Sequence, residues 1–286
     1  MILFVDNLCN IDFSYLCAKR GLVGETWLAS VSLSGELDYQ GMICDFGIVK
    51  KKLRHWLDIT LDHKLLVPSE SKSLKQSTSN GQTKLEFIFG DKDKLLCTSP
   101  TEAVTFVQCT SITPDSVAIW AQNELRSFFG AGVAALSLSF KPEFCSAPYY
   151  HYSHGLKKHA GNCQRIAHGH RSRIEIWRND RLSETDMKWW SENWCDIYLG
   201  TQDDIVEQDD HNTTFAYSAK QGDFSLTLPS SRCDFIELDT TVERIAQHIA
   251  AQLHGAYPDE NIRVKAYEGI NKGAIAEVFA NKQAES

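Results

Sequence analysis

Residues that can bind a metal ion are concentrated in one short stretch of the chain. His154, His168 and His170 lie close together, with Cys163 between the first and the second. The segment after His170 alternates apolar and polar side chains, which predicts a strand. If this strand begins near His168, both imidazoles lie on one face, with Cα atoms about 6.5 Å apart. The spacing allows two rings to converge on one ion, with His154 as the third ligand.

Three histidines and one open coordination position are typical of a catalytic zinc (Zn²⁺) site. Cys163 is not needed as a ligand there, so its thiol is free to act as an acid or base. Two plainer interpretations stay open. A His-x-His pair is common and usually has no function, and Cys163 could be one more buried thiol. The third histidine and the nearby cysteine raise the zinc site to equal weight with these alternatives.

Length and composition describe an ordinary globular protein. The chain has 286 residues, enough for one large domain or two of usual size, and 43% of them are hydrophobic. The formal net charge of −8 argues against a protein that binds nucleic acid or an anionic membrane. No run of about 18 apolar residues occurs, so no transmembrane helix is expected.

The cysteines indicate a reducing environment. There are nine of them, scattered along the chain, and none forms a Cys-x-x-Cys motif. The apolar segment at residues 1–5 is too short for a signal peptide. We therefore expect a cytoplasmic protein whose cysteines are reduced thiols.

The elements that position these residues follow from periodicity and capping residues. Helices are predicted at residues 45–61, 113–125, 186–199 and 239–253. Strands are predicted at residues 27–33, 85–89, 133–140, 149–153, 168–177, 224–228, 262–267 and 274–279. The polar segment 69–84 is predicted to be a mobile loop, 203–210 an acidic loop and 142–148 a linker.

The second part of the chain repeats the plan of the first. Gly24 falls on Gly169 when the two parts are superposed, and the helix at 114–125 falls on that at 242–253. This predicts an α+β fold of two tandem units, each an antiparallel sheet with helices packed on one face. The units would span residues 1–142 and 143–286.

Four groups of residues together resemble the family of 6-pyruvoyltetrahydropterin and 6-carboxytetrahydropterin synthases, zinc enzymes with the tunnelling fold. They are His154 with Cys163 and His168-Gly169-His170; residues 41–46 with 62–66; residues 240–243; and residues 264–268. They touch most of both halves. The resemblance implies a homo-oligomer with active sites between units, and a proton relay shared between neighbouring units.

The family's motifs are divided between the two halves of this chain. The first half has Asp62 and His63, but it has Val-Gly-Glu at residues 23–25 where the family has His-Gly-His. The second half has the zinc ligands and Cys163 but no Asp-His pair at the matching helix end. We therefore expect composite sites, built where a second half meets a first half. Whether the two halves belong to one chain or to different chains stays open.

The resemblance implies a role for each of these residues. Zinc held by the three histidines would bind the substrate's side-chain oxygens, and Cys163 would move protons as its thiolate. His63, oriented by Asp62, would relay the proton. The alternative for Asp62 and His63 is a simple interaction with the dipole at a helix C-terminus.

Two carboxylates are implied to hold the pterin. Glu243, in a motif with Thr241, would accept two N–H donors from the guanidine-like edge of the ring, and Glu268 would assist. The alternatives are that Thr240 and Glu243 form a capping box and that Glu268 faces solvent. Both stay open at this point.

Basic side chains surround the metal motif in an otherwise acidic chain. They are Lys157, Lys158, Arg165, Arg171 and Arg173. A phosphorylated substrate would need such a cluster, with Arg165 as the proposed contact, although a solvated rim is an equally good interpretation.

The resemblance implies a lyase that converts 7,8-dihydroneopterin triphosphate to a 6-substituted tetrahydropterin. The activity expected first is that of a 6-carboxytetrahydropterin synthase in queuosine (deazapurine) synthesis, with release of triphosphate and a two-carbon aldehyde. The alternatives are a 6-pyruvoyltetrahydropterin synthase activity and a non-catalytic relative that binds pterin. No nucleic-acid or membrane partner is expected.

Overall fold

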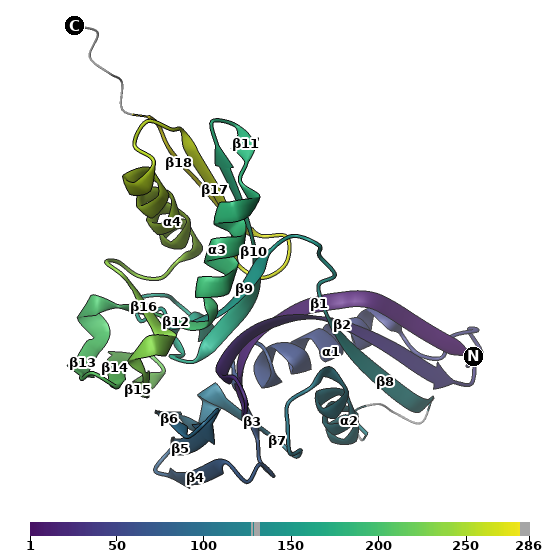
Figure 1. Cartoon of the computed structure of the whole chain (residues 1–286). Coiled ribbons are helices and arrows are strands. Elements are labelled where there is room, and N and C mark those ends of the chain that lie inside the picture. The colour runs from purple at the N-terminus through teal and green to yellow at the C-terminus, as the bar shows by residue number, and fades with distance from the viewer. Residues whose placement is uncertain (127, 129–131, 281–286) are drawn as a thin grey trace, which may run out of the picture.

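The computed structural model describes residues 1–126, 128 and 132–280 of the chain (Figure 1). The first half contains two long strands, a hairpin region and two α-helices. Its elements are β1 (Ile2–Cys17), β2 (Gly21–Gly35), α1 (Phe46–Thr60), β3 (Leu65–Pro68), β4 (Leu74–Ser79), β5 (Gln82–Phe89), β6 (Asp93–Pro100), β7 (Val104–Val107), α2 (Pro114–Glu124) and β8 (Val133–Pro142).

The second half has the same sequence of elements with two short additions, β11 and β18. Its elements are β9 (Tyr149–His154), β10 (His168–Arg178), β11 (Arg181–Leu182), α3 (Glu184–Asn193), β12 (Cys195–Thr201), β13 (Ile205–Gln208), β14 (Asn212–Ala219), β15 (Gly222–Pro229), β16 (Cys233–Ile236), α4 (Val242–Ala256), β17 (Ile262–Tyr267) and β18 (Gly273–Val278).

Sheet topology confirms the predicted duplication. The main sheet of the first half has the order β7-β3-β1-β2-β8, and that of the second half has the order β16-β12-β9-β10-β17-β18. Each strand occupies the place of its counterpart, so the chain is an α+β protein of two repeated units. Each sheet is mixed, because β3 and β7, like β12 and β16, run parallel to their neighbours while the long strands pair antiparallel.

The helices of each half cover one face of its main sheet. Asp45 caps α1 as predicted, since its side chain accepts a hydrogen bond from the Ile48 N–H. The buried stripe of α1, Val49, Leu53 and Leu57, joins a core formed with β1, β2, β8 and α2. A second core lies between α3, α4 and the other main sheet (Figure 1).

A third sheet joins the two halves. It has the order β13-β14-β15-β6-β5-β4, so three strands come from each half. The joint is the antiparallel pair β6–β15, in which Leu226 lies opposite Cys97. Both side chains are buried in a third core, shared between the halves.

The two main sheets approach each other most closely at a pair of glycines. A Cβ on Gly24 would lie 1.8 Å from the Tyr152 carbonyl oxygen, and a Cβ on Gly169 would lie 2.8 Å from the Gly24 Cα. Next to them, the hydroxyls of Ser14 and Ser153 are 2.7 Å apart. Only residues without side chains allow the backbones of β2 and β10 to come this close.

The predicted mobile loop at residues 69–84 is wrong. Most of the segment forms β4 and the start of β5, joined by a two-residue turn at Asn80 and Gly81 with φ of 52° and 75°. Asn-Gly is the typical sequence of such a hairpin turn. The segment has few apolar side chains because β4 is an exposed edge strand and needs none.

Two further boundaries differ from the prediction. The helix predicted at 186–199 is α3, which ends at Asn193, and the apolar residues after it belong to β12. Asp196, with φ of 60°, cannot continue a helix. The predicted acidic loop at 203–210 contains the short strand β13, whose side chains are mostly exposed at the edge of the third sheet.

Two expectations about the whole chain can also be compared with the structure. All nine cysteines are free thiols, as predicted. Among the helices of the described residues, none combines the length and the apolar content that crossing a bilayer requires.

Substitution of Gly24 should destabilise the protein because the added Cβ has no space. We expect Gly24→Ala to lower the free energy of unfolding by about 3 kcal/mol or to prevent folding, as measured by denaturant titration. The control is Gly255→Ala in α4, where a Cβ meets nothing within 4 Å. That variant should gain about 1 kcal/mol, because alanine favours a helix more than glycine does. Equal stabilities of the two variants would contradict the close approach.

Candidate active site between the two halves

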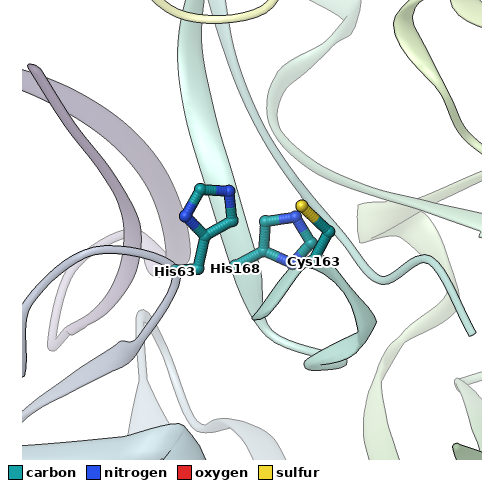
Figure 2. A group of neighbouring side chains, drawn as sticks. All are labelled: His63, Cys163 and His168. Atoms are coloured by element: carbon teal, nitrogen blue, oxygen red, sulfur yellow. The ribbon is translucent and has the colours of Figure 1, made fainter. Parts of the chain in front are cut away.

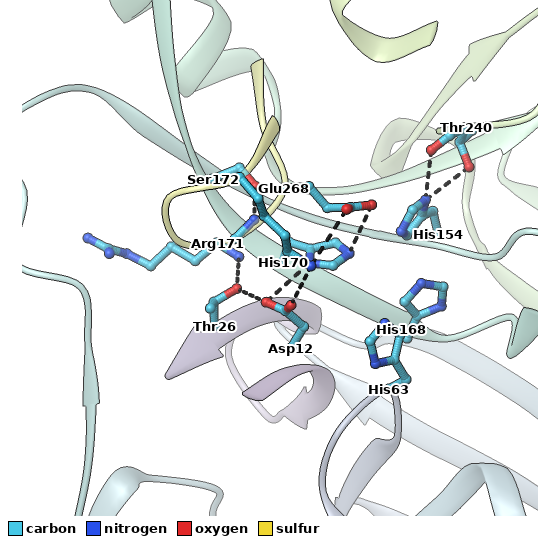
Figure 3. Close-up of polar contacts among 12 residues, drawn as sticks. Asp12, Thr26, His63, His154, His168, His170, Arg171, Ser172, Thr240 and Glu268 are labelled. Carbon is cyan, nitrogen blue, oxygen red and sulfur yellow. Dashed lines mark hydrogen bonds and ion pairs between the residues drawn. The ribbon is translucent and has the colours of Figure 1, made fainter. Parts of the chain in front are cut away.

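The three histidines converge at the start of β10. His154, the last residue of β9, pairs with His168, and His170 lies two residues further along β10 on the same face. Their ligand nitrogens all lie within 4.8 Å of one another, and all three side chains are buried (Figure 3). The period-two alternation predicted from the sequence therefore brings the three imidazoles together.

The outer nitrogens of two rings have fixed partners. His154 Nδ1 lies 3.0 Å from both the carbonyl and the hydroxyl oxygen of Thr240, and His168 Nδ1 lies 2.8 Å from the Arg165 carbonyl oxygen. Donation by Nδ1–H leaves the lone pair of Nε2 for another partner. His154 Nε2 is buried and has no hydrogen-bond partner in the described residues.

Burial and the neighbouring imidazoles hold the pKa values of His154 and His168 well below the usual range. Neutral imidazoles with inward lone pairs are the form that binds a metal ion. The donor set therefore fits a divalent metal, and three nitrogen ligands with a free position suit zinc.

The Asp62–His63 pair of the first half, which the sequence predicts to be a proton relay, lies beside this cluster. His63 Nδ1 is 2.5 Å from Asp62 Oδ2, and the His63 ring, Cys163 sulfur and His168 ring present atoms within 4.8 Å of one another (Figure 2). Burial lowers the pKa of His63, but the hydrogen bonds to Asp62 and Cys163 outweigh it and raise the pKa to about 10. The Asp62 carboxylate thus favours the protonated form of His63. The question left open by the sequence is answered, because Asp62 and His63 meet Cys163 within one chain.

The predicted pterin-binding residues lie at different distances from the cluster. Glu268 Oε1 is 4.0 Å from His170 Nε2. Glu243 is exposed on the first turn of α4, and Thr241 is the N-cap of that helix. The capping box considered for this motif is wrong, since Thr241 makes no side-chain cap bond and the Thr240 hydroxyl contacts His154 instead.

Arg165 is placed differently from the exposed basic rim that the sequence allowed. Its side chain is buried, where Nη1 donates to the His63 carbonyl oxygen at 3.2 Å and Nε donates to Gln221 Oε1 at 3.1 Å. Arg165 therefore ties the relay of the first half to the loop before β10. Its contact with a substrate phosphate stays a prediction.

Two residues near the metal ligands were missed in the sequence. Asp12 Oδ1 lies 3.3 Å from His170 Nδ1, and Lys272 Nζ lies 3.1 Å from Asp12 Oδ2. Burial alone would raise the pKa of Asp12, but His170 and Lys272 together lower it well below the usual range. No local pattern marks Asp12, because it reaches the site only through the crossing of the two halves.

The matching positions of the other half hold Tyr15, Val23 and Glu25 in place of the three histidines. Val23 pairs with Tyr15 as His168 pairs with His154, and Glu25 stands where His170 stands. The place of the relay is taken by an ion pair, in which the Arg20 guanidinium donates to both oxygens of Asp196 at 2.5 and 2.8 Å. The two charged groups at this position therefore pair with each other.

Fold and site together define a duplicated α+β protein with a three-histidine centre at the junction of its halves. The sequence matches the family model described as 6-pyruvoyl tetrahydropterin synthase over residues 18–141 and again over residues 143–278. The chain therefore belongs to this family, in a form with two tandem units. Family membership supports an enzyme of the lyase type with pterin synthase-like activity.

Comparison with individual proteins adds distant relatives. Similar solved structures include the 6-pyruvoyltetrahydropterin synthase of Plasmodium vivax, with 18% identity and a TM-score of 0.39, and that of Plasmodium falciparum, with 17% and 0.38. Each match covers 50% of this chain and 98% of the other. No curated protein matches the chain.

The buried Glu25 should make stability depend on pH. Burial raises its pKa to about 7. The folded state thus holds this proton more tightly than the unfolded chain, and the stability that it contributes is lost as the pH rises through 7. We expect Glu25→Gln to gain about 2 kcal/mol relative to the unsubstituted protein between pH 5 and 8, measured by denaturant titration. The exposed Glu207→Gln is the control, and parallel curves for all three proteins would refute the assignment.

Proposed function

We propose that the chain is a zinc-dependent lyase that converts 7,8-dihydroneopterin triphosphate to a 6-substituted tetrahydropterin. The expected products are those of a 6-carboxytetrahydropterin synthase, with release of triphosphate and a two-carbon aldehyde, in the pathway to queuosine. The observation that carries this proposal is the meeting of Asp62, His63 and Cys163 beside three buried histidines.

His154, His168 and His170 would hold the zinc ion through their inward nitrogens. Bound zinc would act as a Lewis acid that lowers the pKa of a substrate hydroxyl and stabilises the negative charge left when its proton departs. Thr240 and the Arg165 carbonyl would keep two of the rings in the ligating tautomer.

Cys163 would take the proton from the substrate carbon or oxygen and return it at the next position. The adjacent His63 cation would pair with the thiolate and exchange protons with it. Asp62 keeps the His63 ring in place and maintains its positive charge. The same three groups would thus carry the proton in both directions.

Glu243 and Thr241 at the start of α4, together with Glu268, would bind the pterin ring. A cavity of about 480 Å³ is lined by Arg173, Lys265 and Lys272, among others. Each of these cations pairs with a carboxylate of the chain, for which a bound triphosphate group would compete. Arg165 would be a further phosphate contact.

We further propose that residues 1–142 and 143–286 are the two structural units and that the chain forms a homo-oligomer in the cytoplasm. Glu243 is exposed in the single chain, which supports a site completed by a neighbouring copy. The active site would still take its relay and its metal ligands from one chain.

Incubation of the pure protein with zinc and 7,8-dihydroneopterin triphosphate tests the proposal. Triphosphate release and a product with the mass of 6-carboxytetrahydropterin are expected. A 6-pyruvoyl product would correct the product assignment. Tight pterin binding without turnover would instead indicate a binding protein.

Removal of the thiol should separate catalysis from metal binding. We expect Cys163→Ala to lower kcat about 10²- to 10⁴-fold, because general acid–base catalysis contributes that much. Zinc content, measured by elemental analysis, should stay unchanged. Cys109→Ala, at a half-buried cysteine in the core of the first half, is the matched control and should retain activity. Full activity of Cys163→Ala would overturn its assigned role.

Metal stoichiometry should reflect the single set of histidines. We expect one zinc ion per chain, lost on His154→Ala because two nitrogens hold zinc much more weakly than three. Tyr15→Phe, at the matching position of the other half, should keep the ion. Two ions per chain, or retention by His154→Ala, would contradict the ligand assignment.

A further inference from the structure

Asp12 is the residue of the first half that comes closest to the metal ligands. It lies on β1 and is only 4% exposed, because the segment from Glu268 to Lys272 folds over it. Gly269 in that segment has φ of +70°, and a Cβ there would lie 2.5 Å from Asp12 Oδ1. The absence of a side chain at Gly269 therefore leaves the space that the carboxylate occupies.

Both oxygens of the Asp12 carboxylate have partners. The Thr26 hydroxyl donates to Oδ1 at 2.6 Å, and the Lys272 ammonium lies 3.1 Å from Oδ2. Oδ1 also faces His170 Nδ1 at 3.3 Å (Figure 3). Thr26 and Lys272 thus hold the Asp12 carboxylate in place, with Oδ1 facing the ring of His170.

His170 is the ligand whose ring lacks a fixed partner. Within the described residues, both of its nitrogens are buried without a hydrogen bond, although Nδ1 is close to Asp12. A small rotation of the ring would align Nδ1–H with Oδ1. This would leave the Nε2 lone pair to the metal, as Thr240 and the Arg165 carbonyl do for the other two rings.

The backbone of Asp12 holds the relay at the same time. Its N–H donates to Asp62 Oδ1 at 2.8 Å, and its carbonyl oxygen accepts from the His63 N–H at 2.6 Å. His63 has φ of 53°, a conformation that needs such support. One residue therefore contacts the relay through its main chain and the metal ligand through its side chain.

The other half has the opposite arrangement at this place. His151 precedes Ser153 by two residues as Asp12 precedes Ser14, and the two serines meet at the crossing. His151 Nδ1 lies 2.7 Å from the Gly24 carbonyl oxygen and 4.0 Å from Glu25 Oε2, so base and acid are exchanged relative to Asp12 and His170. The carboxylate of this pair, Asp12, therefore lies next to His170, the imidazole that would need an acceptor for its Nδ1–H when Nε2 binds a metal ion.

We infer that Asp12 is a positioning residue of the metal centre, which fixes the ring of His170 for metal binding and couples that ring to the Asp62–His63 relay. This inference rests on the proposed metal site. It means that the first half supplies more than the relay, since it also sets how tightly the second half holds its metal.

Zinc affinity of the full-length chain tests this role without measuring turnover. Competition with a chelator of known affinity should show Asp12→Asn binding zinc about 10- to 100-fold more weakly, the usual cost of losing such a partner. Asp223→Asn, at an exposed aspartate of β15, is the matched control and should leave zinc affinity unchanged. Histidine ¹⁵N NMR of the zinc-loaded protein should show Nδ1–H on His170, and Asp12→Asn should perturb that signal.

The possible outcomes distinguish the proposed metal centre from the proposed role of Asp12. A chain that binds no zinc would overturn the metal centre and the role of Asp12 together. A chain that binds zinc, with the same affinity in folded Asp12→Asn, would overturn only the role of Asp12. If Asp12→Asn does not fold, Thr26→Val removes the hydroxyl that donates to the carboxylate, together with the bond that this hydroxyl accepts from the Arg171 N–H. Zinc binding should then weaken a few-fold, and unchanged affinity would overturn the inference.

Discussion

The close approach of β2 and β10 at Gly24 and Gly169 is the constraint on which the site depends. At this crossing the backbones of two sheets lie closer than any side chain allows. The approach places the Asp62–His63 end of α1 against the loop that carries Cys163, and it places Asp12 against His170. Without it, each half would hold an incomplete set of groups at its own surface.

The two units carry different residues at matching positions, so the two junctions between them differ. A symmetric pair of units would create two equivalent junctions. Here one junction has the relay, the thiol and three imidazoles, and the other has the Arg20–Asp196 ion pair with Glu25 and His151. In this ion pair only the Asp196 carboxylate is buried, and the Arg20 guanidinium satisfies its charge. The chain thus concentrates its chemistry at one junction.

The sequence predicted the parts of this structure that depend on local chemistry. Strand alternation after His168 predicted the convergence of two imidazoles, and Asp45 predicted the start of α1. Superposition of Gly24 on Gly169 predicted the repeat. The polar hairpin at β4 and β5 was missed because an exposed edge strand has no apolar face to reveal it. Asp12 and the choice between one chain and two were not predictable, because both depend on how the halves cross.

Mixing two inactive variants tests most directly whether one chain supplies both parts of the site. Chains with His63→Ala and chains with Cys163→Ala would be unfolded together and allowed to refold and assemble. If relay and thiol meet within each chain, every site retains one lesion and the mixture stays as inactive as its components. If the two residues instead met across chains, half of the His63 side chains and half of the thiols would be intact, so about a quarter of the sites would be complete. Recovery of turnover towards about a quarter of the unsubstituted level would contradict this account.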